Sequence, residues 1–218
     1  MEISVEKTLL EKRKYILEFI DASLGCISEE IAFETDDVKA LCAILKVNES
    51  DFPLDFNWRL EPSEIDELKK CFGIAGGAPD TFAWLRPWEI LDERPYKIHT
   101  NRELAMMLSG DKPFSAFSEK YPAESELEYP EKYFEPYVSA GLFVKKIFIF
   151  GEGDRKGRYV LYAKIGEEWR IEAYMLLKAT AKKEGWNRGF ERMEGSLLGY
   201  ADWQNDIHLD MVYPRREK

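Results

Sequence analysis

The chain has 218 residues, of which 45% are hydrophobic and 14% aromatic, a composition that excludes an intrinsically disordered polypeptide. Its formal net charge is −10, and Lys145 and Lys146 interrupt its longest apolar stretch, far short of the roughly 18 residues that a membrane span needs. We therefore expect a soluble protein with no membrane partner.

The negative charge is unevenly distributed along the chain. Residues 1–92 carry 20 of the 41 acidic side chains but only 10 of the 31 basic ones, whereas residues 93–218 are balanced. Nucleic acid is disfavoured as a partner of the acidic part because its phosphates must be neutralised by Lys and Arg. A basic protein partner fits this charge, and so does an acidic surface that only keeps the protein soluble.

Residues 1–92 are predicted to form an acidic, mainly helical N-terminal portion. Apolar residues at near-helical spacing between charges predict an amphipathic helix over 4–21. Asp37, together with the aspartate before it, is typical of the N-terminal cap of a second helix. Pro62 and Gly73 are typical of the first position and the C-terminal end of a third helix.

The cellular location is indicated by the N-terminus and by the cysteines. The N-terminus is charged throughout and lacks the apolar region of a signal peptide. Cys26, Cys42 and Cys71 are odd in number and widely spaced, so they form no CxxC metal or redox pair. We therefore expect a cytoplasmic protein in which the three thiols are small apolar fillers.

Residues 93–218 are predicted to form an α+β portion, either as a second domain or as part of one continuous domain. Short strands are expected over 96–99 and 113–117, with a helix that closes at Gly110 between them. The segment 119–136 is rich in proline and glutamate and is expected to be a loop or a surface arm.

The clearest structural signal is an antiparallel hairpin between residues 142–150 and 158–165. Both arms have strand-like composition, and a Gly-rich turn within 151–157 joins them. These glycines are followed by a strand, whereas a dinucleotide-binding loop requires a helix whose N-terminus holds the pyrophosphate. The turn therefore predicts a hairpin and no nucleotide cofactor.

Two helices and a final strand are expected after the hairpin, over 167–184, 188–199 and 206–213. The chain is thus predicted to be α+β, a mostly antiparallel sheet with flanking helices, preceded by the helical N-terminal portion. Apolar side chains recur at helical spacing on the two helices and are expected in the main core. They are Trp169, Leu176, Leu177, Phe190, Met193, Leu197 and Leu198.

Asp206, His208 and Asp210 form the most metal-like pattern in the chain. On a strand these side chains would point to one face, where carboxylate and imidazole suit a divalent metal, with Glu191 or Glu194 as a fourth ligand. Such a face would suit a metal-dependent hydrolase or nuclease. The alternative is a solvated strand face, and we expect no metal and no other cofactor.

Two segments are typical of the walls of a binding cleft. The first follows a predicted helix and is rich in aromatic and amide side chains. The second is a strand-to-helix turn whose amides and arginine suit an anion. Either segment can instead be a structural cap. The candidate residues, which would suit a small-molecule-binding protein, are Tyr200, Trp203, Gln204, Asn205, His99 and Arg102.

The sequence carries none of the catalytic motifs GxxxxGK[ST], HExxH or GxSxG. We therefore expect a non-enzymatic interaction protein, analogous to inhibitor or immunity proteins that hold a basic protein partner. The carboxylates of such a surface should form one connected exposed face. They are Glu29, Glu30, Glu34, Asp36, Asp37, Asp51 and Asp55.

Overall fold

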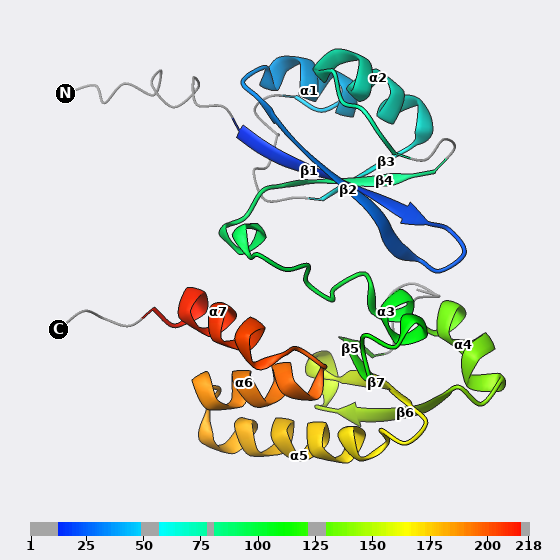
Figure 1. Cartoon of the computed structure of the whole chain (residues 1–218), viewed down its shortest axis with the longest axis vertical. Helices are drawn as coiled ribbons and strands as arrows, with labels where there is room; N and C mark the ends of the chain where they lie inside the picture. Colours follow the sequence, from blue (N-terminus) through cyan, green and yellow to red (C-terminus); the bar gives the residue numbers. More distant parts are fainter. Residues whose placement is uncertain (1–12, 49–56, 78–80, 122–129, 215–218) are drawn as a thin grey trace. The chain divides into compact units, whose positions relative to one another are not determined.

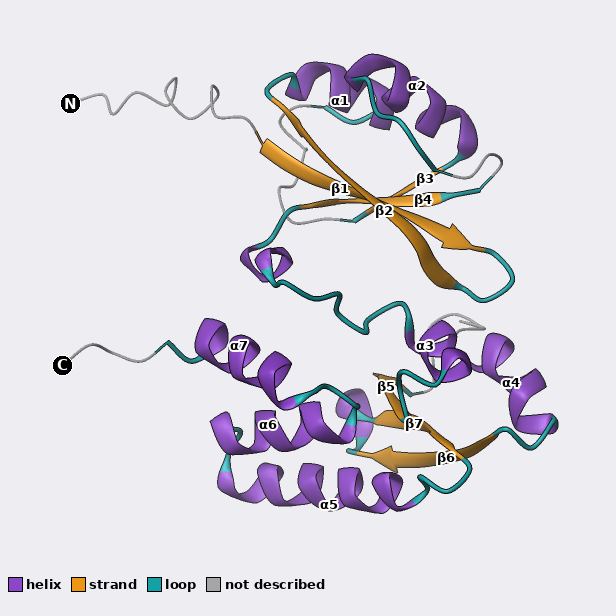
Figure 2. Cartoon of the chain, in the orientation of Figure 1, coloured by secondary structure: helices purple, strands orange, loops and turns teal. Residues whose placement is uncertain are grey.

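The computed structural model of the chain describes residues 13–48, 57–77, 81–121 and 130–214. These residues form two antiparallel sheets, of four and three strands, together with α-helices (Figure 2). The predicted α+β class is confirmed, but the predicted helical N-terminal portion is wrong because the described chain begins with a strand. None of the described helices combines the length and the apolar character needed to cross a bilayer.

The chain divides into two compact units, Met1–Glu93 and Arg94–Lys218. The N-terminal unit is a four-stranded antiparallel sheet of order β2-β1-β4-β3, and Figure 1 shows two helices together on one of its faces. Its elements are β1 (Arg13–Asp21), β2 (Cys26–Thr35), α1 (Val38–Leu45), β3 (Trp58–Leu60), α2 (Pro62–Phe72), β4 (Ala83–Pro87) and a 3-10 turn (Ile90–Glu93).

Strand β1 replaces the helix predicted over 4–21, of which the first part, up to residue 12, lies outside the described residues. Leu17 and Phe19 belong to the core beneath the two helices, whereas Ile16 and Ile20, which alternate with them, are buried on the other face. A strand buried on both faces has a nearly continuous apolar run, and such a run also matches helical spacing. The spacing therefore did not distinguish the two structures.

The three predicted helix boundaries in this unit, at Asp37, Pro62 and Gly73, are confirmed. The Asp37 carboxylate accepts a hydrogen bond of 2.9 Å from the Ala40 amide and so caps α1. Pro62 is the first residue of α2, and Gly73 ends that helix with a φ of 65°, a left-handed conformation that favours glycine. Helix α2 and strand β4 belong to the same unit, whose boundary follows Glu93.

A buried ion cluster fixes the end of the N-terminal unit to its sheet. The Arg86 guanidinium donates two hydrogen bonds to Asp92, of 2.7 and 2.8 Å, and a third of 2.6 Å to Glu18 on β1. Burial works to lower the pKa of Arg86, but the hydrogen bonds that it donates to Asp92 and Glu18 outweigh burial and raise the pKa. The cluster therefore ties the 3-10 turn to β1 through a fully charged arginine.

The C-terminal unit contains a three-stranded antiparallel sheet of order β5-β7-β6. One face packs on α5 through a core that includes Phe114, Leu161 and Ile171. The other face carries stacked aromatic rings, with the centroids of Phe134 and Tyr162 4.2 Å apart. The elements are α3 (Glu103–Ser109), β5 (Phe114–Lys120), α4 (Glu131–Ser139), β6 (Phe143–Phe150), β7 (Gly157–Lys164), α5 (Trp169–Glu184), α6 (Arg188–Leu197) and α7 (Asp202–Val212).

The predicted hairpin of this unit is confirmed. Strands β6 and β7 pair antiparallel from Phe143 opposite Lys164 to Phe150 opposite Gly157, and a short 3-10 turn over Gly153–Arg155 joins them. The helices predicted before Gly110 and over 167–184 and 188–199 are present as α3, α5 and α6. These elements were identified from signals within their own segments, and those local preferences agree with the folded structure.

Three predictions in this unit are wrong. Residues 96–99 are irregular, because the amide of His99 bonds to the Tyr200 hydroxyl rather than to a neighbouring strand. Helix α4 occupies part of the predicted arm 119–136, and residues 122–129 lie outside the described chain. The final strand predicted over 206–213 is helix α7, whose first turn is closed by the Gln204 side chain accepting from the Ala201 amide at 2.8 Å.

Candidate functional site

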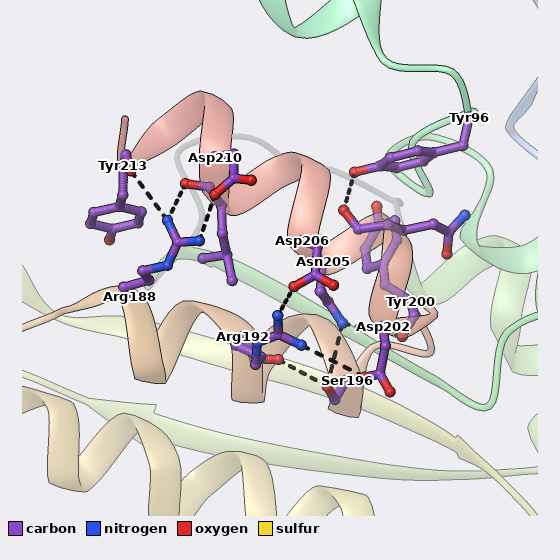
Figure 3. A network of polar contacts seen from close by, with 12 residues as sticks. Tyr96, Arg188, Arg192, Ser196, Tyr200, Asp202, Asn205, Asp206, Asp210 and Tyr213 are labelled. Atoms are coloured by element: carbon purple, nitrogen blue, oxygen red, sulfur yellow. Dashed lines mark hydrogen bonds and ion pairs between the residues drawn. The ribbon is translucent and has the colours of Figure 1, made fainter. Parts of the chain in front are cut away.

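Asp206, His208 and Asp210 lie on helix α7 and not on the strand that would have given them one shared face for a metal. Residues two apart on an α-helix are rotated by about 200°, so His208 and the two aspartates do not share one face. Arg192 pairs with Asp206, and Arg188 pairs with Asp210 at 2.7 Å, both from α6 (Figure 3). Within the described residues, no three His, Cys, Asp or Glu side chains gather as a metal site would require.

His208 has both ring nitrogens engaged. Arg94 Nη2 lies 2.7 Å from Nδ1, and Glu191 Oε1 lies 2.8 Å from Nε2. Because a guanidinium only donates, Nδ1 is the acceptor and Nε2 carries the proton given to Glu191. Burial works to raise the pKa of Glu191, but hydrogen bonds from His208 and Trp186 outweigh it and lower the pKa. The imidazole is thus a link between α7, α6 and the start of the unit.

Glu194, one of the two candidates for a fourth ligand, also forms an ion pair between helices. Its carboxylate pairs with Lys178 of α5 at 2.5 Å. Arg188 additionally donates to the backbone oxygens of Leu209 and Tyr213, at 2.8 and 3.1 Å, and so holds the C-terminal end of α7. The polar residues between α5, α6 and α7 therefore form inter-helix ion pairs, and a hydrolase built on them has no support.

The two segments predicted as walls of a cleft do meet in the structure. The rings of His99 and Tyr200 stack with their centroids 3.8 Å apart and 9° between their planes. The Tyr96 hydroxyl donates to the Gln204 carbonyl at 2.9 Å (Figure 3). The rings of Tyr96 and Trp203 meet edge to face with their centroids 5.4 Å apart. The side chains pack on one another, so this contact joins the 96–102 turn to the start of α7.

Two further residues of the predicted cleft stabilise the same junction. Arg102 is buried, and its guanidinium donates to the backbone oxygens of Ile98 and Thr100 at 3.2 and 3.4 Å. Asn205 is buried at the α6–α7 corner and donates to the Ser196 hydroxyl and the Tyr200 carbonyl at 3.4 and 3.3 Å (Figure 3). Both groups satisfy backbone and side-chain acceptors of the chain itself.

Lys112 is the central residue of this junction and was not singled out by the sequence. Its side chain is only 2% exposed, and Nζ lies 3.0 Å from the Leu198 carbonyl and 3.1 Å from His99 Nδ1. Burial lowers the pKa of Lys112 to about 8, with the charge of Glu103 acting in the opposite direction. Burial and then the charge of Lys112 lower the pKa of His99 to about 4, so the imidazole is neutral and accepts from the ammonium.

The predicted core of the two long helices is only partly correct. Leu177 is buried, and Leu197 and Leu198 pack against the core as partly buried residues. Trp169, Leu176 and Met193 are instead 56%, 70% and 57% exposed. Helix α5 has a second apolar stripe, Ile171, Tyr174, Leu177 and Ala181, and this is the stripe that is buried.

The exposed stripe of α5 lines an apolar groove with α6. The groove has a volume of about 610 Å³. Its two arginines are engaged by the chain, because Arg170 donates to the Ser196 and Leu197 carbonyls at 3.0 Å each and Arg192 pairs with Asp206. The apolar side chains that line it are Trp169, Ala173, Leu176, Leu177, Phe190, Met193 and Leu197.

The carboxylates expected on one acidic face do not share a face in the described part of the chain. Glu29 and Glu34 point to opposite sides of β2, because side chains alternate along a strand. Glu29 accepts a hydrogen bond from the Gly77 amide at 3.0 Å, and Asp37 caps α1. Asp51 and Asp55 lie outside the described residues.

The exposed apolar surface is a candidate binding surface that the sequence analysis did not identify. In the described residues, all large apolar side chains that are exposed belong to the C-terminal unit, and three of them line the α5–α6 groove. Comparisons with known proteins found no matching protein-family model, no matching curated protein and no matching solved structure. The chemistry of this surface is therefore the guide to function.

Proposed function

We propose that the chain is a non-enzymatic interaction protein whose C-terminal unit binds another polypeptide in the α5–α6 groove. The observation that carries this proposal is the adjacent exposure of Trp169, Leu176 and Met193 along one groove. Large exposed apolar patches are disfavoured in monomeric proteins and mark interaction surfaces. Burial of such surface contributes about 25 cal/mol per Å², so a partner that covers it gains affinity directly.

The groove is shaped for the side chains of a helix. It runs between α5 and α6, two neighbouring helices joined by a short connection at 185–187. Ridges of side chains on one helix fit the furrow between two others, which is the usual way that amphipathic helices are recognised. Trp169 offers the large, flat surface that is enriched at the energetic centre of interfaces.

The positions of the histidines support a role without catalysis. The chain has two histidines, and neither is arranged as a general base. His99 is buried and accepts from Lys112, while His208 has both nitrogens bonded to charged side chains. A general base needs a nitrogen within reach of a substrate proton, and these two imidazoles hold elements of the fold together instead.

A basic protein remains a second proposed partner, for the N-terminal unit. The excess of negative charge in residues 1–92 supports it, because unlike charges accelerate association. The spread of Glu29 and Glu34 over both faces of β2 makes the apolar groove the better-defined surface.

We place the protein in the cytoplasm, as the three cysteines are thiols, which suits a reducing compartment.

A small apolar molecule is the alternative ligand of the same groove. Its volume of about 610 Å³ falls within the range of roughly 300–1,000 Å³ that is typical of ligand sites. The groove is open along the helix pair, which favours a polypeptide. Native mass spectrometry of the purified chain distinguishes the two, because a bound metabolite adds a small defined mass and a protein partner adds a large one.

The proposed function is tested by Leu176→Glu, which places a charge in the middle of the groove. The tagged chain is used as bait, captured proteins are identified, and each complex is reconstituted from purified components, with an untagged copy of the chain among the candidates. We expect the binding of a defined protein to be lost in Leu176→Glu and retained in Ile149→Glu. Ile149 is a matched control, 55% exposed on β6, on the sheet face opposite α5. Equal binding by both variants would show that the groove is not the binding surface.

A further inference from the structure

We propose that the polypeptide bound in the α5–α6 groove is a second copy of this chain, with α5 packed antiparallel on α5 around a two-fold axis near Leu176. This proposal rests on the proposed function and specifies its partner. Three features of α5 and α6 favour such a dimer: the position of one apolar stripe, the order of the charges along α5, and the size of the two-helix face.

The exposed stripe of α5 is centred on Leu176. Trp169, Ala173, Leu176 and Thr180 follow one another at intervals of four, three and four residues, which places them along one side of the helix. Among the described residues Leu176 is the most exposed large apolar side chain, at 70%, and it lies midway between Trp169 and Lys183. In a two-fold interface the residue at the axis meets its own copy, so a protruding leucine is well placed there.

The charges of α5 are complementary to those of an antiparallel copy. Glu168 and Glu172 lie near its beginning, where Arg170 is paired with Glu167, and Lys182 and Lys183 lie near its end, before the final Glu184. An antiparallel copy brings the acidic end of one helix to the basic end of the other, whereas a parallel copy would oppose like charges. Glu172 and Lys183 are both exposed and lie four residues before and seven residues after Leu176, on the same stripe.

The order of charge also agrees with the helix dipole. Acidic side chains near the N-terminus and basic ones near the C-terminus are favourable within one helix, and antiparallel helices place opposite ends of their dipoles together. The same axis brings Trp169 opposite Lys183 of the second copy, a pair that suits a cation–π contact. Lys183 of the second copy thus faces Trp169 directly and lies about one turn from Glu172.

The face formed by α5 and α6 has the size that a dimer needs. Helix α5 has 16 residues and is therefore about 24 Å long, and two adjacent helices are about 20 Å wide. The resulting footprint, on the order of 500 Å² in projection, is of the same order as the roughly 800 Å² of accessible surface that each partner of a stable complex buries. Two such helix pairs would together form a four-helix bundle, whose core the exposed side chains would fill.

The oligomeric state of the full chain tests this proposal. Sedimentation equilibrium over a wide range of concentrations is expected to give a dimer for the natural chain and for Ile149→Glu, and a monomer for Leu176→Glu. Circular dichroism is measured on each variant, since an unchanged helical signal separates loss of association from loss of fold. A natural chain that stays monomeric throughout would overturn the proposal.

Charge reversal supplies a second test that misfolding cannot imitate. Glu172→Lys places a lysine about one helical turn from Lys183 of the second copy, twice per dimer, and is expected to raise the dissociation constant roughly tenfold. The double variant Glu172→Lys with Lys183→Glu restores opposite charges and should return the constant to its original value. A double variant no tighter than the single one would contradict the antiparallel arrangement.

Cysteine cross-linking locates the axis. Leu176→Cys in a Cys71→Ser background is expected to form a disulfide-linked dimer on mild oxidation, because Cys26 and Cys42 are buried and Cys71 is the exposed thiol. Ile149→Cys in the same background should not cross-link. A monomeric chain that still binds another protein in a Leu176-dependent manner would refute the second copy and leave the proposed function intact. A chain that binds neither would refute both.

Discussion

Mild acid should weaken the C-terminal unit through His99. The imidazole is buried, stacked on Tyr200 and hydrogen-bonded to the Lys112 ammonium, and its pKa is lowered from 6.5 to about 4, by burial first and by the Lys112 charge second. Between these two pH values the unfolded chain binds a proton that the folded chain does not. The free energy of unfolding therefore falls as the pH falls through this window.

The size of this effect follows from the two pKa values of His99. With pKa values of 6.5 unfolded and about 4 folded, the linkage relation gives a loss of about 2 kcal/mol at pH 5 and about 3 kcal/mol at pH 4, compared with neutral pH. Below pH 4 the folded imidazole is protonated too, and this contribution levels off. Such a loss is a large share of the stability of an ordinary domain.

The variant His99→Phe isolates this contribution. Phenylalanine keeps a ring against Tyr200 but does not titrate, and the lost acceptor of Lys112 costs about 1 kcal/mol at every pH in the window. Urea unfolding of both proteins is measured from pH 7 to pH 4.5 and the difference in stability is plotted against pH. The natural chain should lose its advantage as the pH falls.

If the stabilities of the natural chain and of His99→Phe stay parallel down to pH 4.5, the proposed effect of His99 is refuted. Parallel profiles would mean that the imidazole takes up its proton equally easily in both states, so that it is neither desolvated nor exposed to the Lys112 charge. A change in the slope of the urea transition would instead indicate that the variant alters the compactness of the unfolded state, and the comparison would then be repeated with His99→Leu.

Four further substitutions test the packing and the ion pairs by urea unfolding. Leu17→Ala, at a fully buried position of β1, should cost about 2–5 kcal/mol, and a loss below about 0.5 kcal/mol would place the side chain at the surface. Leu176→Ala should stay within about 0.5 kcal/mol at a concentration where the chain is monomeric, and a large loss would mean that this stripe is buried within one chain. Arg86→Met leaves the Glu18 carboxylate buried without its partner and should cost about 3–5 kcal/mol, so a neutral outcome would argue against the buried cluster. Asp37→Ala should cost about 1 kcal/mol through the lost cap of α1, with Asp37→Asn as the variant that retains most of it.

The elements that could be predicted are those with local signals. The β6–β7 hairpin has a Gly-rich turn between strand-like arms, and α2 has a proline at its start and a glycine at its end. Strand β1 was predicted as a helix and helix α7 as a strand, because the apolar residues of each fit both the helical and the strand period. Packing decides between the two structures. In α7, the burial of Asn205 and Leu209, four residues apart, reveals the helical period that the alternation of apolar residues concealed.

The candidate site could be predicted only in part, because local sequence signals do not show which segments pack together. The segments around His99 and Tyr200 were both selected for their composition, and the structure brings them together. Lys112 carries no sequence signal, because only the fold reveals that it lies beneath Leu198 rather than in water. The groove was missed because α5 has two apolar stripes, and the sequence does not indicate which one faces the sheet.

The strand order of the two sheets has a consequence for synthesis on the ribosome. In the N-terminal sheet β1 lies between β2 and β4, so the second edge of β1 stays unpaired until residues 83–87 have emerged. Such distant pairing is slow, and an incompletely paired strand is open to association with other chains in the meantime. The C-terminal sheet differs, because β6 and β7 are consecutive and can pair as soon as both are made, with β5 already available to join them. The N-terminal sheet is therefore the part of the nascent chain for which a chaperone would matter most.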